Sequence, residues 1–196
     1  MDRRAFLREA PRLAGLSALA LGGVAAAPVV LSAAGSDARS RLASCRSSIR
    51  RLDPTNRIHF EMRTLDGPIF RIAEYRGRPL MINFFASWCP PCREETPAIV
   101  DLATRLAPLH DAVVLGIDID DSDAQARAFR REFAIPYAIG MDAGGAFFDS
   151  LGGCALPTTL FVDRAGRVAR ARTGALTPQR MTAEFARVIE RAPVAS

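Results

Sequence analysis

The sequence contains no lysine, so its 26 basic residues are all arginine, and it has only one tryptophan and two tyrosines. With so few stacking platforms, and no run of arginines interleaved with aromatic residues, the composition argues against a nucleic-acid-binding protein. The arginines are scattered among 21 acidic residues, and we interpret the net charge of +5 as that of a solvated surface.

Ligands for a metal are also scarce, because the chain has two histidines and four cysteines. Beside the close pair Cys89 and Cys92, the remaining nitrogen and sulfur candidates are Cys45, His59, His110 and Cys154. None of them stands at the spacing of a zinc site, and both histidines are isolated, which indicates surface or turn residues. We therefore expect no metal and no cofactor.

The acidic run "DIDDSD" holds Asp118, Asp120, Asp121 and Asp123. It lacks the glycine and the terminal glutamate of a calcium loop. Capping of the helix that follows is the better interpretation of these residues.

Residues 1–36 indicate an export signal or a membrane anchor. Four arginines precede an uncharged stretch from Leu13 to Ser36, and about 20 residues suffice to cross a bilayer. The segment "DRRAFLRE" resembles the twin-arginine pattern of bacterial export signals, although Asp2 precedes the pair and Arg8 stands where lysine is usual. The general secretory route is the alternative. By either route the arginines stay in the cytoplasm, and we expect the rest of the chain in the periplasm.

One domain is expected over residues 58–192, after a polar tether at 37–57. It opens with a hairpin of strands at 58–64 and 69–72, followed by a nearly continuous apolar strand at 80–86 that is typical of burial on both faces. Further strands are predicted at 112–118, 137–140, 158–163 and 168–173, and helices at 89–109, 123–133, 146–151 and 178–191, the first of them kinked at Pro97. This order predicts an α/β fold with a central mixed sheet flanked by helices, extended at its N-terminus by the hairpin.

The segment "FFASWCPPCREETP" puts Cys89 and Cys92 at the junction between the apolar strand and the first helix. Prolines are tolerated in the first turn of a helix, so Cys89 falls at or just before the N-cap and Cys92 one turn inside. The free amides and the helix dipole favour negative charge there, which predicts Cys89 as the nucleophile of disulfide exchange and Cys92 as the resolving cysteine. The alternatives are half of a metal site and a purely structural disulfide, for which such a junction is a poor place.

Two motifs, "NFFASWCPPCREETP" and the downstream "LPTTLFVDRAGRV", together resemble the thioredoxin fold. More specifically, the chain from Ile58 to Arg191 is similar to the TlpA/ResA-like branch of exported, often membrane-tethered thiol-disulfide oxidoreductases. The resemblance implies Cys89 and Cys92 as the redox pair and Trp88 as its flanking residue. It also implies that Pro157 is a cis-proline facing the disulfide, which is an uncommon geometry.

Glu95 matches the acid that this family places near its active site, three residues after Cys92 on the same helical face. A partly buried carboxylate there would oppose ionisation of Cys92 or accept its proton during resolution. The alternative is that Glu95 is only a favourable acid in the first turn of the helix. Its neighbour Glu94 is expected to be solvated.

The two remaining cysteines, Cys45 in the tether and Cys154 three residues before Pro157, form a second pair in our interpretation. An oxidising compartment favours a structural disulfide between them, which would clamp the tether beside the active-site loop. The alternative is that Cys154 exchanges with the redox pair.

These observations predict a monomeric, periplasmic protein-disulfide oxidoreductase that reduces specific partner proteins. The resemblance implies apocytochromes c or copper-delivery proteins as partners, and an upstream electron donor in the membrane. A disulfide oxidase or isomerase is one alternative, which the redox potential would distinguish. A copper-binding assembly factor on the same fold is another, but such proteins space their cysteines more widely and add a histidine, and here none follows His110.

Overall fold

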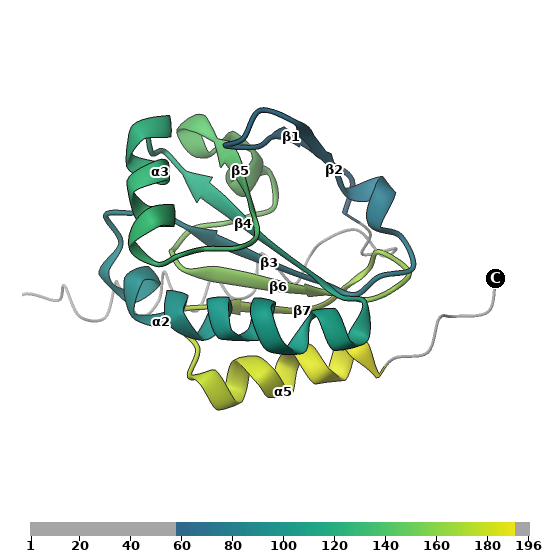
Figure 1. Cartoon of the computed structure of the whole chain (residues 1–196). Coiled ribbons are helices and arrows are strands. Elements are labelled where there is room, and N and C mark those ends of the chain that lie inside the picture. Colours follow the sequence, from purple (N-terminus) through teal and green to yellow (C-terminus); the bar gives the residue numbers. More distant parts are fainter. Residues whose placement is uncertain (1–57, 191–196) are drawn as a thin grey trace, which may run out of the picture. The chain divides into compact units, whose positions relative to one another are not determined.

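The computed structural model describes residues 58–190, which form a five-stranded mixed sheet with a two-stranded hairpin beside it (Figure 1). The sheet has the order β5-β4-β3-β6-β7, in which β3, β4 and β5 run parallel and β6 and β7 run antiparallel to their neighbours. Its strands are β3 (Leu80–Phe85), β4 (Val113–Ile119), β5 (Ala138–Asp142), β6 (Thr158–Val162) and β7 (Val168–Thr173). The hairpin consists of β1 (Glu61–Arg63) and β2 (Ile69–Arg71). The predicted fold class is confirmed.

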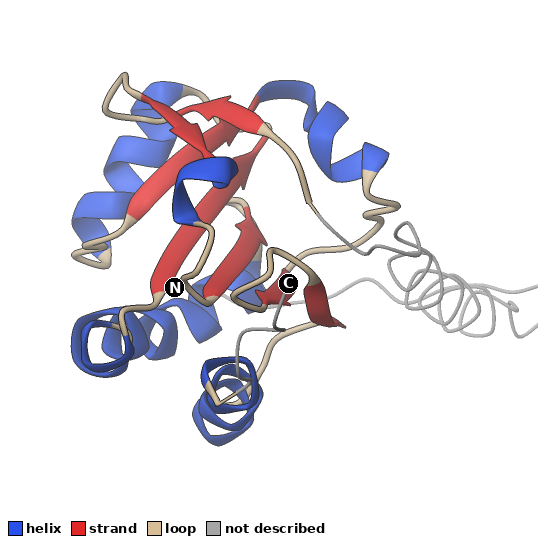
Figure 2. Ribbon diagram, turned by 90° about the vertical axis from the view of Figure 1, so that its right-hand side faces the viewer, coloured by secondary structure: helices blue, strands red, loops and turns tan. Residues whose placement is uncertain are grey.

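Helices cover both faces of the sheet (Figure 2). They are α2 (Pro90–Asp101), α3 (Asp123–Glu132), α4 (Ala146–Ser150) and α5 (Pro178–Ile189). Short turns of 3-10 helix lie at Ile72–Tyr75, Pro108–His110 and Ala143–Gly145. One buried apolar cluster joins α2, α3 and α5 to the sheet, and we call this side the α2 face. A second cluster joins the hairpin and α4 to the opposite side, which we call the hairpin face.

Strand β3 is the centre of the molecule, because it pairs with β4 on one side and β6 on the other. All six of its residues are buried, as the apolar run predicts for a strand covered on both faces. Its alternate side chains enter the two clusters, Phe85 on the α2 face and Phe84 on the hairpin face. The chain leaving β3 therefore starts α2 at the middle of the sheet edge.

Arginines fasten the hairpin to α3. The guanidinium of Arg63 donates to the carboxylate of Asp123 at 2.7 Å, and that of Arg130 donates to both oxygens of Asp66 at 2.6 and 2.7 Å. A third arginine, Arg127, donates to the carbonyl of Leu65 at 2.6 Å. The fork of donors on each guanidinium suits such paired contacts.

The long helix expected at 89–109 is shorter and less regular than predicted. The α-helix begins at Pro90 and runs through Pro97 to Asp101, and a π-helical turn follows at Leu102–Leu106. In that turn the amide of Ala107 donates to the carbonyl of Leu102, five residues back. Pro108 has no N–H with which to continue the ladder, so the helix ends there.

The run "DIDDSD" does precede a capped helix, but the capping side chain is not an aspartate. Ser122 is the N-cap of α3, and it forms a capping box with Gln125. The aspartates of the run have other contacts, described below.

No helix within residues 58–190 is long and apolar enough to span a bilayer. The expected export signal at 1–36 and tether at 37–57 lie outside the described residues, and so do the last two residues of the expected domain.

Candidate active site

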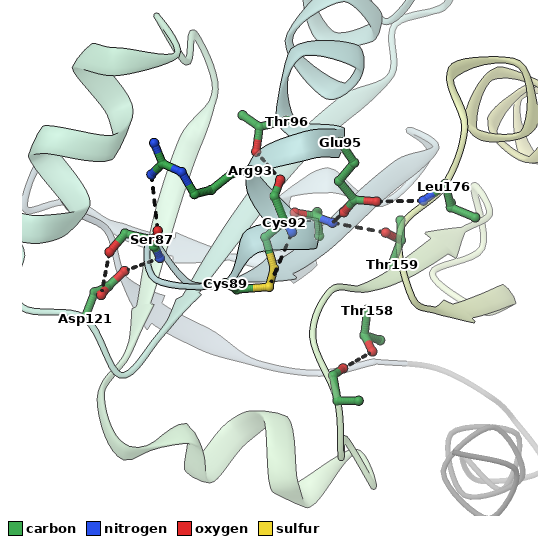
Figure 3. Close-up of a disulfide and its surroundings, with 12 residues drawn as sticks. Ser87, Cys89, Cys92, Arg93, Glu95, Thr96, Asp121, Thr158, Thr159 and Leu176 are labelled. Carbon is green, nitrogen blue, oxygen red and sulfur yellow. Dashed lines mark hydrogen bonds between the residues drawn. A yellow bond between two sulfur atoms is a disulfide. The ribbon is translucent and has the colours of Figure 1, made fainter. Parts of the chain in front are cut away.

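Cys89 and Cys92 form a disulfide at the start of α2, with a Cα–Cα distance of 5.3 Å (Figure 3). Cys89 is the N-cap residue of the helix, as the sequence predicts, and the backbone N–H of Cys92 donates to its Sγ at 3.3 Å. This amide is one of those that the first helical turn leaves without an intrahelical partner. A sulfur that accepts it and lies at the positive end of the helix dipole is favoured as the site of negative charge.

Both cysteines are buried, but the residue that precedes them is exposed. Cys92 is 1% exposed and Cys89 4%, whereas the preceding Trp88 has 58% of its surface open to solvent. Trp88 is the only tryptophan of the chain. Because it directly precedes Cys89 in the chain, its fluorescence is a local reporter of the disulfide.

Glu95 is buried, at 3% exposure, on the same side of α2 as Cys92. One carboxylate oxygen accepts from Asn83 Nδ2 at 2.8 Å, and the other accepts from the backbone N–H of Leu176 at 2.9 Å. Burial raises the pKa of Glu95 to about 7, and these two hydrogen bonds oppose the rise. The alternative of a first-turn acid is wrong, because α2 begins at Pro90 and has no acid in its first turn, and the exposed acid is Glu94.

Asn83 belongs to the site although the sequence analysis did not select it. Its Nδ2 donates to Glu95 and, at 3.1 Å, to the hydroxyl of Thr159 on β6. The signal was present, because Asn83 is the one polar residue in the apolar run of β3. A buried amide has to find partners, so such a residue points to a polar neighbour across the core.

The peptide bond between Leu156 and Pro157 is cis, which is the geometry expected from the resemblance. Pro157 is buried and immediately precedes β6, whose first residue, Thr158, pairs with Phe84 of β3. The topology thus brings the cis-proline to the same edge of the sheet from which the chain of β3 continues to Cys89.

A further group of contacts holds Ser87, two residues before Cys89. The carboxylate of Asp121 accepts from the backbone N–H of Ser87 at 2.7 Å and from its hydroxyl at 2.9 Å. The carbonyl of Ser87 accepts from Arg93 Nη1 at 3.2 Å. Arg93 also pairs with Glu132 and lies over the rings of Phe129 and Phe133. The backbone N–H, the hydroxyl and the carbonyl of Ser87 are therefore all hydrogen-bonded, which fixes the segment that leads to Cys89.

Cys154 lies in an exposed position of the loop between α4 and β6 and is not a free cysteine. Its expected partner, Cys45, lies outside the described residues, so their disulfide stays a prediction. The two histidines, His59 and His110, are exposed, as expected.

A Cys-X-X-Cys disulfide at the start of a helix, on a sheet of this topology, defines a thioredoxin-fold thiol-disulfide oxidoreductase. The model of the AhpC/TSA family matches residues 55–171, and the chain belongs to that family.

Relatives with curated names agree with this class. The chain is 33% identical over 132 residues to a thiol:disulfide interchange protein DsbE homolog of Paracoccus denitrificans, covering 66% of this chain and 70% of that protein. It is 24% identical over 123 residues to the thiol-disulfide oxidoreductase ResA of Bacillus thuringiensis, covering 63% and 70%. The protein is thus a protein-disulfide oxidoreductase of the TlpA/ResA-like group.

Solved structures show the same fold. A thioredoxin family thiol:disulfide interchange protein from Chlorobium tepidum superposes with a TM-score of 0.63 at 25% identity, over 70% of this chain and 97% of that one. A secreted disulfide oxidoreductase of Mycobacterium tuberculosis, described as homologous to E. coli DsbE, gives a TM-score of 0.59 at 23% identity, over 66% and 96%.

Proposed function

We propose that the protein works in the periplasm as a reductant of disulfides in specific partner proteins. The observation that carries the direction of electron flow is the buried carboxylate of Glu95 on the side of α2 that holds Cys92. Once ionised, it disfavours a second negative charge nearby and so destabilises the thiolate form of the reduced pair. Because Glu95 offsets part of the stabilisation that the helix N-terminus gives to the Cys89 thiolate, the reduced form gives up its electrons more readily than in a strong disulfide oxidant.

In the proposed reaction the thiolate of Cys89 attacks one sulfur of the partner's disulfide, forming a mixed disulfide and releasing the partner's other sulfur as a thiolate. Cys92 then loses its proton to Glu95 and attacks Sγ of Cys89. This attack breaks the mixed disulfide and releases the partner's second sulfur as a thiolate, which leaves the protein with the Cys89–Cys92 disulfide. The partner has gained two electrons, and it becomes a dithiol by taking one proton from Glu95 and one from solvent. Glu95 is suited to this transfer because its pKa of about 7 is close to neutral pH.

The location and the partners rest on the N-terminal pattern and on the relatives. An arginine-rich start followed by an uncharged stretch supports export, by the twin-arginine or the general secretory route, with or without a retained anchor. A structural neighbour from Mycobacterium tuberculosis is described as secreted, which supports the same compartment. Apocytochromes c and copper-delivery proteins are the partner classes we propose, with electrons supplied from the membrane.

The redox equilibrium of the purified protein tests the direction of electron flow. Trp88 fluorescence reports the state of the pair in glutathione and in dithiothreitol buffers, and a Cys89→Ser/Cys92→Ser variant supplies the baseline. A reductant stays oxidised in glutathione buffers and is reduced only by dithiothreitol, with a potential nearer that of thioredoxin, about −270 mV, than that of a strong oxidant, about −120 mV. Ready reduction by glutathione would instead identify a disulfide oxidase or isomerase.

A further inference from the structure

A second buried acid lies near the redox pair, outside the mechanism described so far. Asp118, at the carboxyl end of β4, is 0% exposed, and neither of its carboxylate oxygens has a hydrogen-bond partner among the described residues. Burying a charged carboxylate without partners costs free energy, so such a carboxyl group is expected to be neutral in the folded protein or to have a functional role.

Strand register shows which side Asp118 occupies. Leu115 and Ile117 enter the cluster of the hairpin face, so by alternation Asp118 points to the α2 face. Its partner in register on β3 is Phe85, which lies in the same cluster as Cys89. Asp118 is therefore on the face of the sheet that carries the disulfide, beside the strand that leads to it.

Asp118 interacts electrostatically with the acid that holds Ser87. Asp121, three residues further on, is the carboxylate that accepts both hydrogen bonds from Ser87. Burial, and then the negative charge of Asp121, raise the pKa of Asp118 to about 8. Asp121 is itself buried, so a second negative charge on Asp118 would stand close to its carboxyl group in a medium that screens charge poorly.

Other charges near this end of β4 do not replace Asp121. Charged and titratable groups at this end of the sheet are Asp120 in the same loop, Cys89, Arg93 and Glu95 at the start of α2, Asp123, Arg127 and Glu132 in α3, Tyr137 before β5 and Asp142 at its end. Asp142 is in register with Ile119, on the hairpin side of the sheet, and its carboxylate accepts from the backbone N–H groups of Phe147 and Phe148. Asp120, Asp123 and Arg127 are exposed, and Arg93 is paired with Glu132. On β5, the residue in register with Asp118 is the uncharged Met141.

We propose that Asp118 is a positioning residue of the redox site: its neutral carboxyl lets Asp121 hold Ser87, and its ionisation weakens that hold on the segment leading to Cys89. When Asp118 ionises its proton goes to solvent, and no electron moves. The second negative charge also opposes a thiolate at Cys89. Figure 3 shows that Ser87 and Asp121 lie on one side of the disulfide and Glu95 on the other, so the contact that holds Ser87 is separate from the Glu95 carboxyl group.

Fluorescence of Trp88 tests the proposal in the oxidised full-length protein, in which Cys89 and Cys92 cannot titrate. A Glu95→Gln background removes the other acid of raised pKa. We expect a change of emission with a midpoint near pH 8, which Asp118→Asn abolishes and the matched variant Asp120→Asn, two residues away and exposed, retains. A transition that survives in Asp118→Asn overturns the proposal, and so does the lack of one in the parent protein.

A redox equilibrium separates positioning from a purely structural role. The equilibrium constant with dithiothreitol is compared between the wild type and Asp118→Asn at about pH 6 and about pH 9, on either side of the transition. We expect equal constants at the lower pH and, at the higher, a shift of about threefold or more toward the reduced form in the variant, the size of one charge acting through several ångströms of protein.

Equal constants at both pH values, or the same shift at both, would contradict a proton-linked role. Asp118→Ser gives a second uncharged variant should the asparagine fail to fold. Because both measurements compare variants with the wild type, they do not depend on whether the protein reduces or oxidises its partners.

Discussion

Glu95 of α2 and Asn83 of β3 are joined by a buried hydrogen bond of 2.8 Å, twelve residues apart in the sequence. The same Asn83 amide group donates to Thr159, so it is fixed from both neighbouring elements. The carboxyl group of Glu95 is consequently held in one place, between a side-chain donor and the backbone of Leu176.

Replacement of Asn83 by leucine, which has a similar shape, should raise the pKa of Glu95 above its present value of about 7. The hydrogen bond from Asn83 stabilises the ionised carboxylate, and its loss leaves burial less opposed. Carbon-detected NMR titration of the glutamate carboxyl groups measures this shift, and the exposed Glu94 in the same sample is the internal control. An unchanged or lower pKa for Glu95 would show that Asn83 does not act on it.

Glu95→Gln should make the protein less sensitive to rising pH. The pKa of Glu95 is raised from 4.5 to about 7 in the folded state, so the folded protein holds this proton more tightly than the unfolded chain. Stability from that difference is fully present below about pH 4.5 and is lost as the pH rises to 7. Denaturant midpoints at pH 5 and pH 8 should therefore fall less in the variant than in the wild type.

The same variant should slow the resolution step. A positioned general acid or base contributes about 100-fold or more, so the release of a reduced partner from the mixed disulfide should fall by a comparable factor at neutral pH. Rapid quenching of the reaction with a disulfide-containing peptide measures it. An equal rate in wild type and variant would reduce Glu95 to a structural residue.

Cys92→Ala should trap a mixed disulfide between Cys89 and a peptide disulfide, whereas Cys89→Ala should not form one. The difference follows from the positions of the two sulfurs, because Cys89 is the N-cap of α2 and its Sγ accepts from a free amide, whereas Cys92 lies one turn inside the helix. Mass spectrometry of the acid-quenched reaction counts the adducts. Equal trapping by both variants would mean that the roles of the cysteines are not distinct.

The structural disulfide between Cys45 and Cys154 is tested by peptide mapping without reduction. We expect these two cysteines in one linked fragment of the oxidised protein, and an unlinked Cys45 peptide would exclude the clamp. In the chain-entropy model, Cys45→Ser/Cys154→Ser should lower the free energy of unfolding by about 4 to 5 kcal/mol. The redox potential should be unchanged in this double variant if the second pair does not exchange with the first.

The parts of this molecule that the sequence predicts are those whose signals are local. The apolar run of β3, the prolines after Cys89 and the alternation of strands and helices are each contained within a few residues. The missed contacts join distant parts of the chain: Ser87 to Asp121 across 34 positions, and Glu95 to Leu176 across 81.

The other differences between the sequence prediction and the structure depend on which residues the fold buries. Asp118 and Asp121 stand in one acidic run in the sequence, and only the fold separates a buried acid without partners from one that holds Ser87. The cap of α3 shows the same limit, because serine and aspartate are both good N-caps and backbone geometry selected Ser122.

The absence of lysine has a consequence for where pH can act on this protein. The contacts between the hairpin and α3 all use guanidinium groups, which keep their charge through any pH that a folded protein meets, and they lower the pKa of Asp66 and Asp123. The acids with pKa values near neutrality, Glu95 and Asp118, both lie on the face that carries the disulfide. A change of external pH near neutrality would thus alter the protonation of the acids around the disulfide, while the ion pairs between the hairpin and α3 stay charged.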